Sequence, residues 1–170
     1  VKVDRIELTS ARVSEKEKDT VTNIIKTLGQ SKHFEILTFI DSNLSIDWVD
    51  DCGVKVINLL TKGSMKHLKY QLKKTPEEHL KDIDYEIQYA HQKKMDVNVY
   101  LEDWSNGMIN SRDYVYFLIE KLKDKVKRIM LPDTLGILNP DLTYDFVKDL
   151  YERYPNVQFD FHPHNDYGLA

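Results

Sequence analysis

The sequence has little of three features that would each point to a particular class of protein. It has one cysteine, Cys52, so no disulfide can form within the chain. No apolar run approaches the ~20 residues that span a bilayer, and the first residues lack the pattern of a signal peptide. Lysine and arginine form no cluster beyond short pairs such as Lys73-Lys74 and Lys93-Lys94, and the net charge is −4. Both observations disfavour nucleic acid and membrane as partners. We therefore expect a globular protein of the cytoplasm.

Nucleotide-binding motifs are also missing. No Gly-x-Gly-x-x-Gly follows the first strand-like run, which weakens a dinucleotide-binding interpretation. The segment 59–64 is similar to a phosphate-binding loop but lacks the Walker spacing, so a strand end followed by a helix cap is the favoured interpretation.

Short apolar runs recur along the chain, and their richness in Val, Ile, Leu and Phe predicts strands. They are Val3–Leu8, Phe34–Ile40, Val54–Leu60, Val97–Glu102, Val126–Leu131 and Val157–Phe161. Amphipathic stretches between the runs predict helices, and capping residues mark several of their ends. The helices are expected over 14–28, 45–51, 75–94, 111–122 and 141–154.

This alternation of strand and helix predicts a parallel sheet with helices outside it. An open doubly wound sheet and a closed barrel are the two alternatives. A complete (β/α)8 barrel needs ~250 residues. Six strands in 170 residues predict a partial (β/α)8 TIM barrel, a single domain over 1–170 with about six of eight βα units. Because the chain starts at Val1 without a Met, almost directly inside a strand-like run, and stops at Ala170 after a polar motif, we expect a fragment of a longer protein.

Polar residues gather where the predicted strands end, which is the catalytic rim of such barrels. The sharpest signal is His162-x-His164, because residues two apart on a strand face the same side and two imidazoles can converge on one metal ion. Catalytic metal sites usually take three protein ligands. Asp160 shares that face, but no certain third ligand is evident in the sequence. The alternative is a surface or hydrogen-bonded histidine pair in a loop.

Two other strand ends carry candidate site residues. Tyr100 and Glu102 share a face, so Glu102 could orient a substrate or accept a proton while Tyr100 walls the pocket. The alternative for Glu102 is a rim carboxylate paired with Lys or Arg. Thr134 could donate to a substrate carboxylate, with Gly136 permitting a tight turn, and the alternative there is a helix-capping Asp or Thr. The remaining histidines are expected to be solvated, namely His33, His67, His79 and His91.

Three segments together resemble one known family of metal-dependent barrels. Leu131–Gly136, His162–Asp166 and Asp4–Ser14 are similar to motifs of 2-isopropylmalate synthase, homocitrate synthase, citramalate synthase and hydroxymethylglutaryl-CoA lyase. The resemblance covers essentially the whole chain. It implies an acyl-CoA-dependent enzyme on a (β/α)8 barrel.

The resemblance also implies roles for individual residues. His162 and His164 would bind a divalent metal, for which Zn²⁺, Mn²⁺, Co²⁺ and Mg²⁺ all suit the ligands. Thr134 would contact the carboxylate of a 2-oxo acid, and Glu102 would lie beside the reacting centre. The family's first strand supplies a third metal ligand and a catalytic arginine. Neither that strand nor the eighth is present, so we expect this piece alone to be inactive.

Within the family, the stretches 58–64 and 99–106 resemble the citramalate synthase branch. There, positions matching Leu37, Leu60 and Tyr100 wall the 2-oxo acid pocket, and a bulky tyrosine should favour pyruvate over a branched acid. A difference of this size discriminates by only ~1–3 kcal/mol, so substrates can overlap. The resemblance further implies acetyl-CoA as co-substrate, a Claisen-type condensation that releases CoA, and a homodimer for the intact protein.

Other functions stay open on the sequence alone. The first is 2-isopropylmalate synthase with 2-oxoisovalerate as acceptor, and the second is a metal-dependent acyl-CoA lyase that runs the reverse chemistry. A third is a hydrolase of the amidohydrolase type, although its His-x-His ends the first strand rather than a late one. The non-enzyme alternative is an inactive barrel fragment or interaction module.

Overall fold

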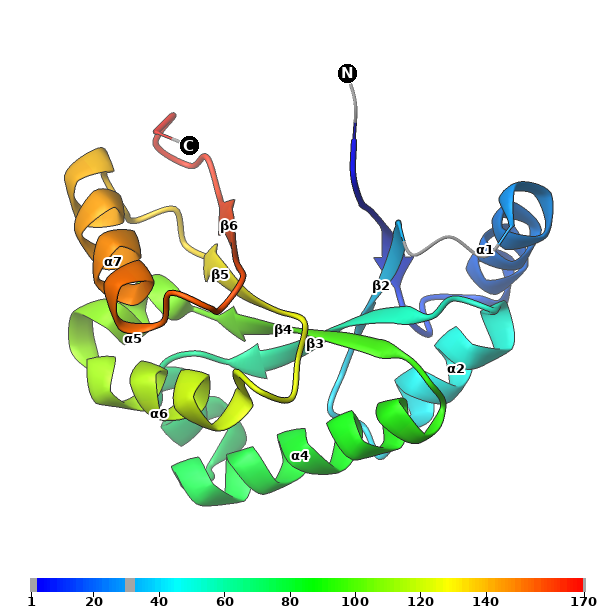
Figure 1. The fold of residues 1–170 in the computed structure, drawn as a ribbon, viewed down its shortest axis with the longest axis horizontal. Coiled ribbons are helices and arrows are strands. Elements are labelled where there is room, and N and C mark those ends of the chain that lie inside the picture. Colours follow the sequence, from blue (N-terminus) through cyan, green and yellow to red (C-terminus); the bar gives the residue numbers. More distant parts are fainter. Residues whose placement is uncertain (1–2, 30–32, 170) are drawn as a thin grey trace. The chain divides into compact units, whose positions relative to one another are not determined.

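The computed structural model describes residues 3–29 and 33–169, so both chain ends, Val1 and Ala170, lie outside the described residues. Its strands form one sheet and correspond to the predicted ones, with small displacements of their ends. They are β1 (Ile6–Ser10), β2 (Phe34–Thr38), β3 (Val56–Lys62), β4 (Asp96–Glu102), β5 (Arg128–Asp133) and β6 (Phe159–Pro163) (Figure 1).

The strands are ordered in the sheet as they are along the chain, β1-β2-β3-β4-β5-β6. Pairing is parallel, with Leu37 opposite Asn58 between β2 and β3 and Leu131 opposite Phe161 between β5 and β6. A doubly wound sheet reverses its strand order at a switch point, whereas a (β/α)8 barrel does not. The fold is therefore a partial (β/α)8 barrel, as the alternation predicts.

Helices follow the strands, and all the predicted ones are present. The first, α1 (Glu15–Leu28), begins after Ser14, whose hydroxyl accepts a hydrogen bond from the backbone N–H of Glu17. It ends at Gly29, where φ is 82°, a value that favours glycine. The others are α2 (Leu44–Cys52), α4 (Pro76–Gln92), α6 (Arg112–Leu122) and α7 (Pro140–Arg153). None of the helices within 3–29 and 33–169 is long and apolar enough to cross a membrane.

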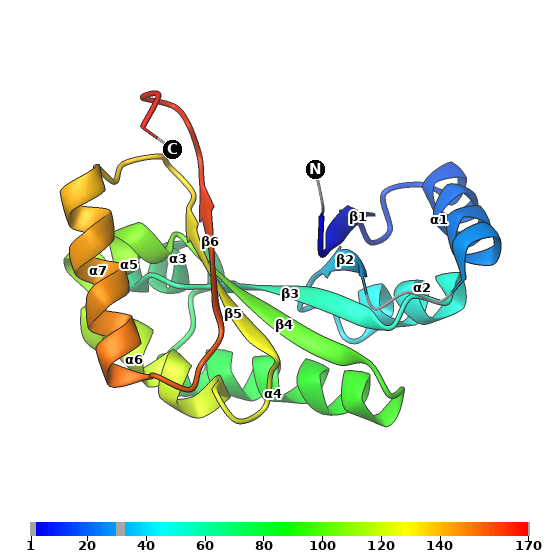
Figure 2. The same ribbon diagram turned by 45° about the horizontal axis from the view of Figure 1, so that its top comes forward.

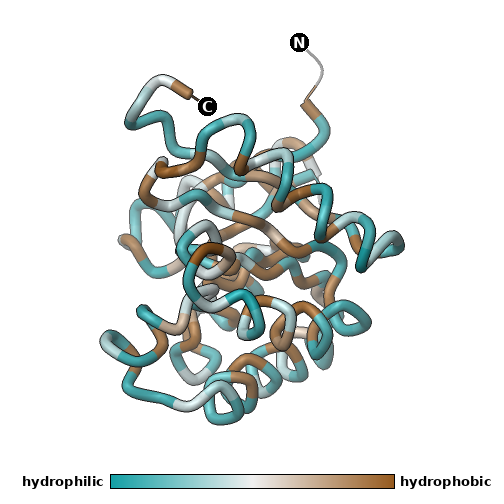
Figure 3. The backbone as a smooth tube through the Cα atoms, turned by 90° about the vertical axis from the view of Figure 1, so that its left-hand side faces the viewer, coloured by the Kyte–Doolittle hydropathy of each residue, from teal (hydrophilic) through white to brown (hydrophobic). Residues whose placement is uncertain are grey.

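The structure adds short helical elements that the sequence patterns did not predict. They are α3 (Met65–His67), the π-helical turn η1 (Leu68–Leu72) and α5 (Trp104–Asn110). Ser64 caps α3 by accepting from the backbone N–H of His67 at 3.2 Å, which confirms the cap interpretation of that segment. Figure 3 shows hydrophobic and hydrophilic stretches alternating along the tube, as amphipathic helices require.

The chain divides into two compact units. Unit 1 comprises Val1–Leu60 and Asp82–Asn98, and unit 2 comprises Thr61–Lys81 and Val99–Ala170. Within unit 1, α1 and α2 lie on the same side of β1 and β2 (Figure 1). Within unit 2, α5, α6 and α7 lie on one side of β5 and β6 (Figure 2).

A polar cluster around Asn58 lies among the strands of unit 1. The Asn58 amide donates to Glu7 at 2.6 Å and to Glu35 at 3.1 Å, and it accepts from the Asn98 amide at 2.8 Å. Asn58 and Asn98 are fully buried, and Glu35 is nearly so. A buried amide without hydrogen bonds destabilises the fold, so these contacts are what allows asparagine to lie inside the sheet.

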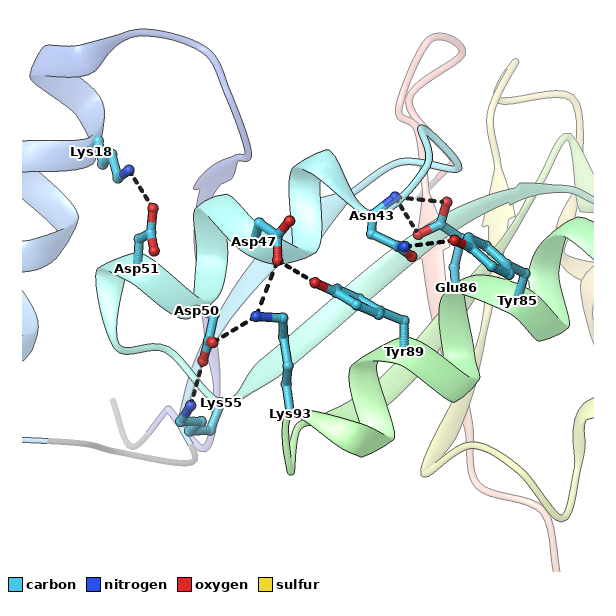
Figure 4. A network of polar contacts seen from close by, with 10 residues as sticks. All are labelled: Lys18, Asn43, Asp47, Asp50, Asp51, Lys55, Tyr85, Glu86, Tyr89 and Lys93. Carbon is cyan, nitrogen blue, oxygen red and sulfur yellow. Dashed lines mark hydrogen bonds and ion pairs between the residues drawn. The ribbon is translucent and has the colours of Figure 1, made fainter.

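A second polar network in unit 1 joins α2 and α4 (Figure 4). The buried carboxylate of Glu86 accepts from the backbone N–H groups of Asp41, Ser42 and Asn43 at 2.9–3.3 Å. Ser42 and Asn43 both have positive φ, 61° and 71°, which is uncommon outside glycine. Glu86 therefore holds the strained turn between β2 and α2.

In unit 2, the segment after β3 packs directly on β4 and α5 through two glycines. A Cβ on Gly63 would lie 2.5 Å from the carbonyl oxygen of Leu101, and a Cβ on Gly107 would lie 2.1 Å from that of Gly63. No side chain fits at either position without moving backbone. This close approach fixes the end of β3 against the end of β4.

Candidate active site

Most of the predicted site residues belong to one unit and lie at successive strand ends. Tyr100 and Glu102 are in the last part of β4, Thr134 directly follows β5, and His162 is in β6 with His164 just beyond it. All five are in unit 2. Parallel strands in sequential order bring their carboxyl ends to one edge, which is where barrel enzymes build their sites.

The two histidines lie side by side and are exposed. Their ring centroids are 5.4 Å apart and the ring planes are inclined by 33°. Tyr100 packs edge-on against His162, with centroids 5.7 Å apart and its hydroxyl 3.4 Å from Nδ1. The buried tyrosine thus contacts one ring nitrogen of His162 and leaves Nε2 available to a ligand.

The spacing of the two rings suits a shared metal ion. A metal–nitrogen distance of about 2.1 Å puts each ring centre roughly 3.2 Å from the ion, and a tetrahedral angle then separates the centres by about 5.2 Å. In the described part of the chain, no group of three or more His, Cys, Asp and Glu side chains could hold a metal. Asp160 instead forms an ion pair with Arg128 at 3.3 Å. These residues therefore offer two imidazole ligands.

Glu102 forms an ion pair with Lys62, the last residue of β3. The side chains are 23% and 18% exposed, so the pair is reachable from solvent. The structure thus shows the paired carboxylate that the sequence left as one alternative. A paired carboxylate keeps lone pairs that can act on a substrate, so the ion pair is compatible with a role of Glu102 in the site.

The hydroxyl of Thr134 accepts a hydrogen bond from the backbone N–H of Asp103 at 2.9 Å. A hydroxyl carries one proton and two lone pairs, so accepting this bond leaves the proton free to be donated elsewhere. Asp103 has a left-handed backbone, with φ 64° and ψ 30°, and its buried carboxylate accepts from Ser64 and Asn106 at 2.6 and 2.7 Å. Thr134 can therefore donate a second hydrogen bond while it accepts this one.

The turn that carries Thr134 is built by Asp133 and Gly136. The carboxylate of Asp133 accepts from Ser105 at 2.7 Å and from the backbone of Leu138 at 2.9 Å, so it caps its own loop. Gly136 has φ 59°, and a Cβ there would lie 2.7 Å from Oδ2 of Asp166. The loop after β5 therefore packs on the segment after His164, and the positive φ of Gly136 agrees with the tight turn predicted there.

Leu37 and Leu60 lie on β2 and β3 and belong to unit 1. Both are partly buried. Their assignment to the substrate pocket stays a prediction.

Sequence reasoning was wrong about His79 and did not find Lys62. His79 is fully buried rather than solvated, and its Nδ1 lies 2.7 Å from the hydroxyl of Tyr114. The signal was available, because His79, Ile83 and Ile87 recur at helical spacing on the buried face of α4. Nothing local marks Lys62, since its partner is forty positions away in the sequence.

The sequence of the chain matches a family of known enzymes that includes the barrel synthases. A family profile described as HMGL-like matches residues 1–170. The chain is similar to the (R)-citramalate synthase CimA of Methanocaldococcus jannaschii, with 30% identity over 99% of the chain and 33% of that protein. It is similar to a 2-isopropylmalate synthase of Saccharolobus solfataricus, with 31% identity over 99% of the chain and 43% of that protein.

Solved structures share the architecture. Hydroxymethylglutaryl-CoA lyase from Pseudomonas aeruginosa matches with a TM-score of 0.78 at 16% identity, over 98% of this chain and 58% of that one. At this identity the likeness concerns the fold. The chain spans less than half the length of the two synthases it matches.

Proposed function

Since the chain belongs to the HMGL-like family, we propose that it is the barrel part of an enzyme that condenses acetyl-CoA with a 2-oxo acid. Pyruvate is the favoured acceptor, which makes the product citramalate. The intact protein is a cytoplasmic homodimer, and residues 1–170 belong to a single catalytic barrel domain. The parts that this chain lacks supply the third metal ligand and the main base.

The observation that carries this proposal is the histidine pair beside Tyr100. His162 and His164 are held 5.4 Å apart at the end of β6, with Tyr100 against the first of them. His162 and His164 would hold a divalent ion, which when bound would supply Lewis-acid chemistry for the 2-oxo acid. Thr134 donates a hydrogen bond from its hydroxyl to the substrate carboxylate, and Glu102 orients the reacting groups.

The reaction balances with these groups and water. A base removes a proton from the methyl group of acetyl-CoA, and the resulting carbon attacks the ketone carbon of the 2-oxo acid. One carbon–carbon bond forms, and the ketone oxygen gains a proton to become a tertiary alcohol. Water then cleaves the thioester, which releases the CoA thiol and leaves a second carboxylate.

The size of Tyr100 underlies the preference for pyruvate. The ring is 8% exposed and packs against His162, so it occupies space next to the group that binds the ketone. A methyl substituent fits beside such a ring more easily than an isopropyl group. The expected discrimination is modest, about 1–3 kcal/mol.

The test measures release of the CoA thiol by the full-length protein, with acetyl-CoA and either pyruvate or 2-oxoisovalerate, with and without divalent metal. His162→Ala should abolish metal-dependent release and lower bound metal, measured by elemental analysis of the purified protein. His91→Ala is the matched control, because His91 is an exposed histidine of α4 and should behave as wild type.

Each result has a definite consequence for the proposal. Metal-dependent release with pyruvate that is lost in His162→Ala supports it. Faster release with 2-oxoisovalerate would overturn the role of Tyr100 and assign the protein as a 2-isopropylmalate synthase. No release with either acid, but metal-dependent cleavage of a 3-hydroxyacyl-CoA, would replace condensation with the lyase direction.

A further inference from the structure

Glu102 is held at its side chain by the neighbouring strand end. Lys62 closes β3 and Glu102 closes β4, and their charged groups are in direct contact. Glu102 follows the alternation of its strand, so it shares a face of β4 with Tyr100. The ammonium group therefore holds the carboxylate on the face of β4 that carries Tyr100.

The backbone of Glu102 is held by Gly63, the residue that follows Lys62. The N–H of Gly63 donates to the carbonyl oxygen of Glu102 at 2.7 Å. Because a Cβ at Gly63 would lie 2.5 Å from the carbonyl oxygen of Leu101, the two segments cannot separate or slide without losing this fit. Lys62 and Gly63 thus hold Glu102 by its side chain and by its main chain.

Lys62 is itself held by a buried pair of side chains. Tyr114 from α6 donates its hydroxyl to the carbonyl oxygen of Lys62 at 3.1 Å, and Nδ1 of His79 from α4 lies 2.7 Å from the same hydroxyl. Tyr114 is 5% exposed and His79 is fully buried. Burial raises the pKa of Tyr114, so the hydroxyl keeps its proton and stays a donor at neutral pH.

Stability alone gives little reason for the ion pair. Partly exposed ion pairs contribute little to stability, because solvent screens them and two long side chains lose conformational freedom. The ion pair instead fixes the position of the carboxylate. The backbone carbonyl of Lys62 is bound by Tyr114, which contacts His79, and the ammonium group of Lys62 contacts Glu102. Lys62, Tyr114 and His79 together therefore hold the carboxylate of Glu102 in place.

We propose that Lys62 is a positioning residue for Glu102, and that the buried His79–Tyr114 pair positions Lys62 in turn. The inference rests on the proposed function, because it assigns a support to the carboxylate that acts there. It predicts that Lys62 matters for turnover only through Glu102.

The test is a double-mutant cycle in the full-length enzyme, with kcat and KM measured for the 2-oxo acid. Lys62→Met should lower kcat about 10- to 100-fold by misplacing the carboxylate, with KM nearly unchanged. Lys62→Arg, which keeps the charge, should recover part of the loss. In a Glu102→Gln background, Lys62→Met should cost less than about threefold more, because the two residues act as one unit.

Controls separate positioning from a general loss of structure. Lys123→Met removes an exposed ion pair with Glu120 at 2.7 Å and should leave kcat and the melting temperature unchanged. Tyr114→Phe should lower kcat less than Lys62→Met does, and this effect too should vanish in the Glu102→Gln background. A melting temperature near that of wild type shows that Lys62→Met still folds, and Lys62→Arg carries the test if it does not.

The outcomes are distinguishable from those of the functional test. An active wild type in which the losses of Lys62→Met and Glu102→Gln multiply would overturn this inference and leave the proposed function intact. A wild type without turnover in either direction would overturn both. An active wild type with non-multiplying losses and recovery by arginine supports both.

Discussion

Replacing Glu86 with alanine should lower the free energy of unfolding by about 3 kcal/mol. The side chain is 1% exposed, and its carboxylate is the common acceptor for three successive backbone N–H groups, those of Asp41, Ser42 and Asn43. Left-handed backbone costs non-glycine residues about 1–3 kcal/mol each and persists only where the surroundings enforce it. Without Glu86, the turn at Ser42 and Asn43 loses the hydrogen bonds that hold its left-handed backbone in place.

The magnitude follows from the three N–H groups. Asn43 is buried, so its N–H would be left without an acceptor at a cost of about 1–3 kcal/mol. Those of Asp41 and Ser42 lie closer to solvent and contribute less each. Glu86→Gln keeps an amide oxygen as acceptor and should cost about 1 kcal/mol or less. Glu120→Ala, at an exposed position of α6, is the matched control and should stay within about 0.5 kcal/mol of wild type.

The assay is urea unfolding at neutral pH, with hydrogen exchange at amides 41–43 as a local measure. The pH dependence supplies a second readout. Burial raises the pKa of Glu86 above its ordinary range, so the fold favours the protonated carboxyl. The pH-dependent part of the stability contributed by such a group is fully present below the unfolded pKa of about 4.3 and is lost as pH rises through the folded pKa. The three hydrogen bonds that Glu86 accepts persist at neutral pH.

Wild type should therefore lose stability relative to Glu86→Gln as pH rises through that window. A Glu86→Ala protein within about 0.5 kcal/mol of wild type would refute the assigned role of the carboxylate. A wild type that gains on Glu86→Gln over the same pH range would contradict the raised pKa alone, because the sign would then be that of a carboxylate stabilised by folding.

Two further substitutions test other contacts. Gly107→Ala should destabilise by about 2–3 kcal/mol in a thermal melt, because its Cβ would lie 2.1 Å from the carbonyl oxygen of Gly63; a neutral or stabilising result, the usual effect of Gly→Ala in a helix, would contradict this packing. Lys93→Met removes contacts to Asp47 at 3.1 Å and Asp50 at 3.0 Å and should cost less than about 1 kcal/mol, diminishing in high salt. The pKa of Lys93 is raised, first by Asp50 and then by Asp47, so its contribution should be present at neutral pH and be lost as pH rises into strong alkali, as urea unfolding across pH would reveal.

Local signals in the sequence were sufficient for most of the fold. Ser14 and Gly29 mark the ends of α1 in the sequence, and the structure uses both as caps. α5 was missed because it is short and contains Gly107 and two asparagines, which are poor helix formers. Its stability comes instead from burial of Trp104 and Met108, which only the assembled sheet provides.

The candidate site divides in the same way. The spacing of His162 and His164 on one strand is local information, so their proximity could be predicted. The partner of Glu102 could not, because it depends on how far β3 extends alongside β4. The orientation of Thr134 depends on the left-handed backbone of Asp103, and single residues in that conformation carry no periodic signal.

The buried amide of Asn58 bears on how the sheet assembles. Parallel strands are joined through long connections, so no tight turn fixes which residues face one another. If β3 were shifted by one residue against β2, Asn58 would turn to the opposite face and lose Glu7, Glu35 and Asn98 together. In a layer of aliphatic side chains, a shifted strand would lose one set of apolar contacts and gain another. Here each buried polar group left without a hydrogen bond costs about 1–3 kcal/mol. Asn58 thus destabilises strand pairings in the wrong register and favours the native one while the barrel folds.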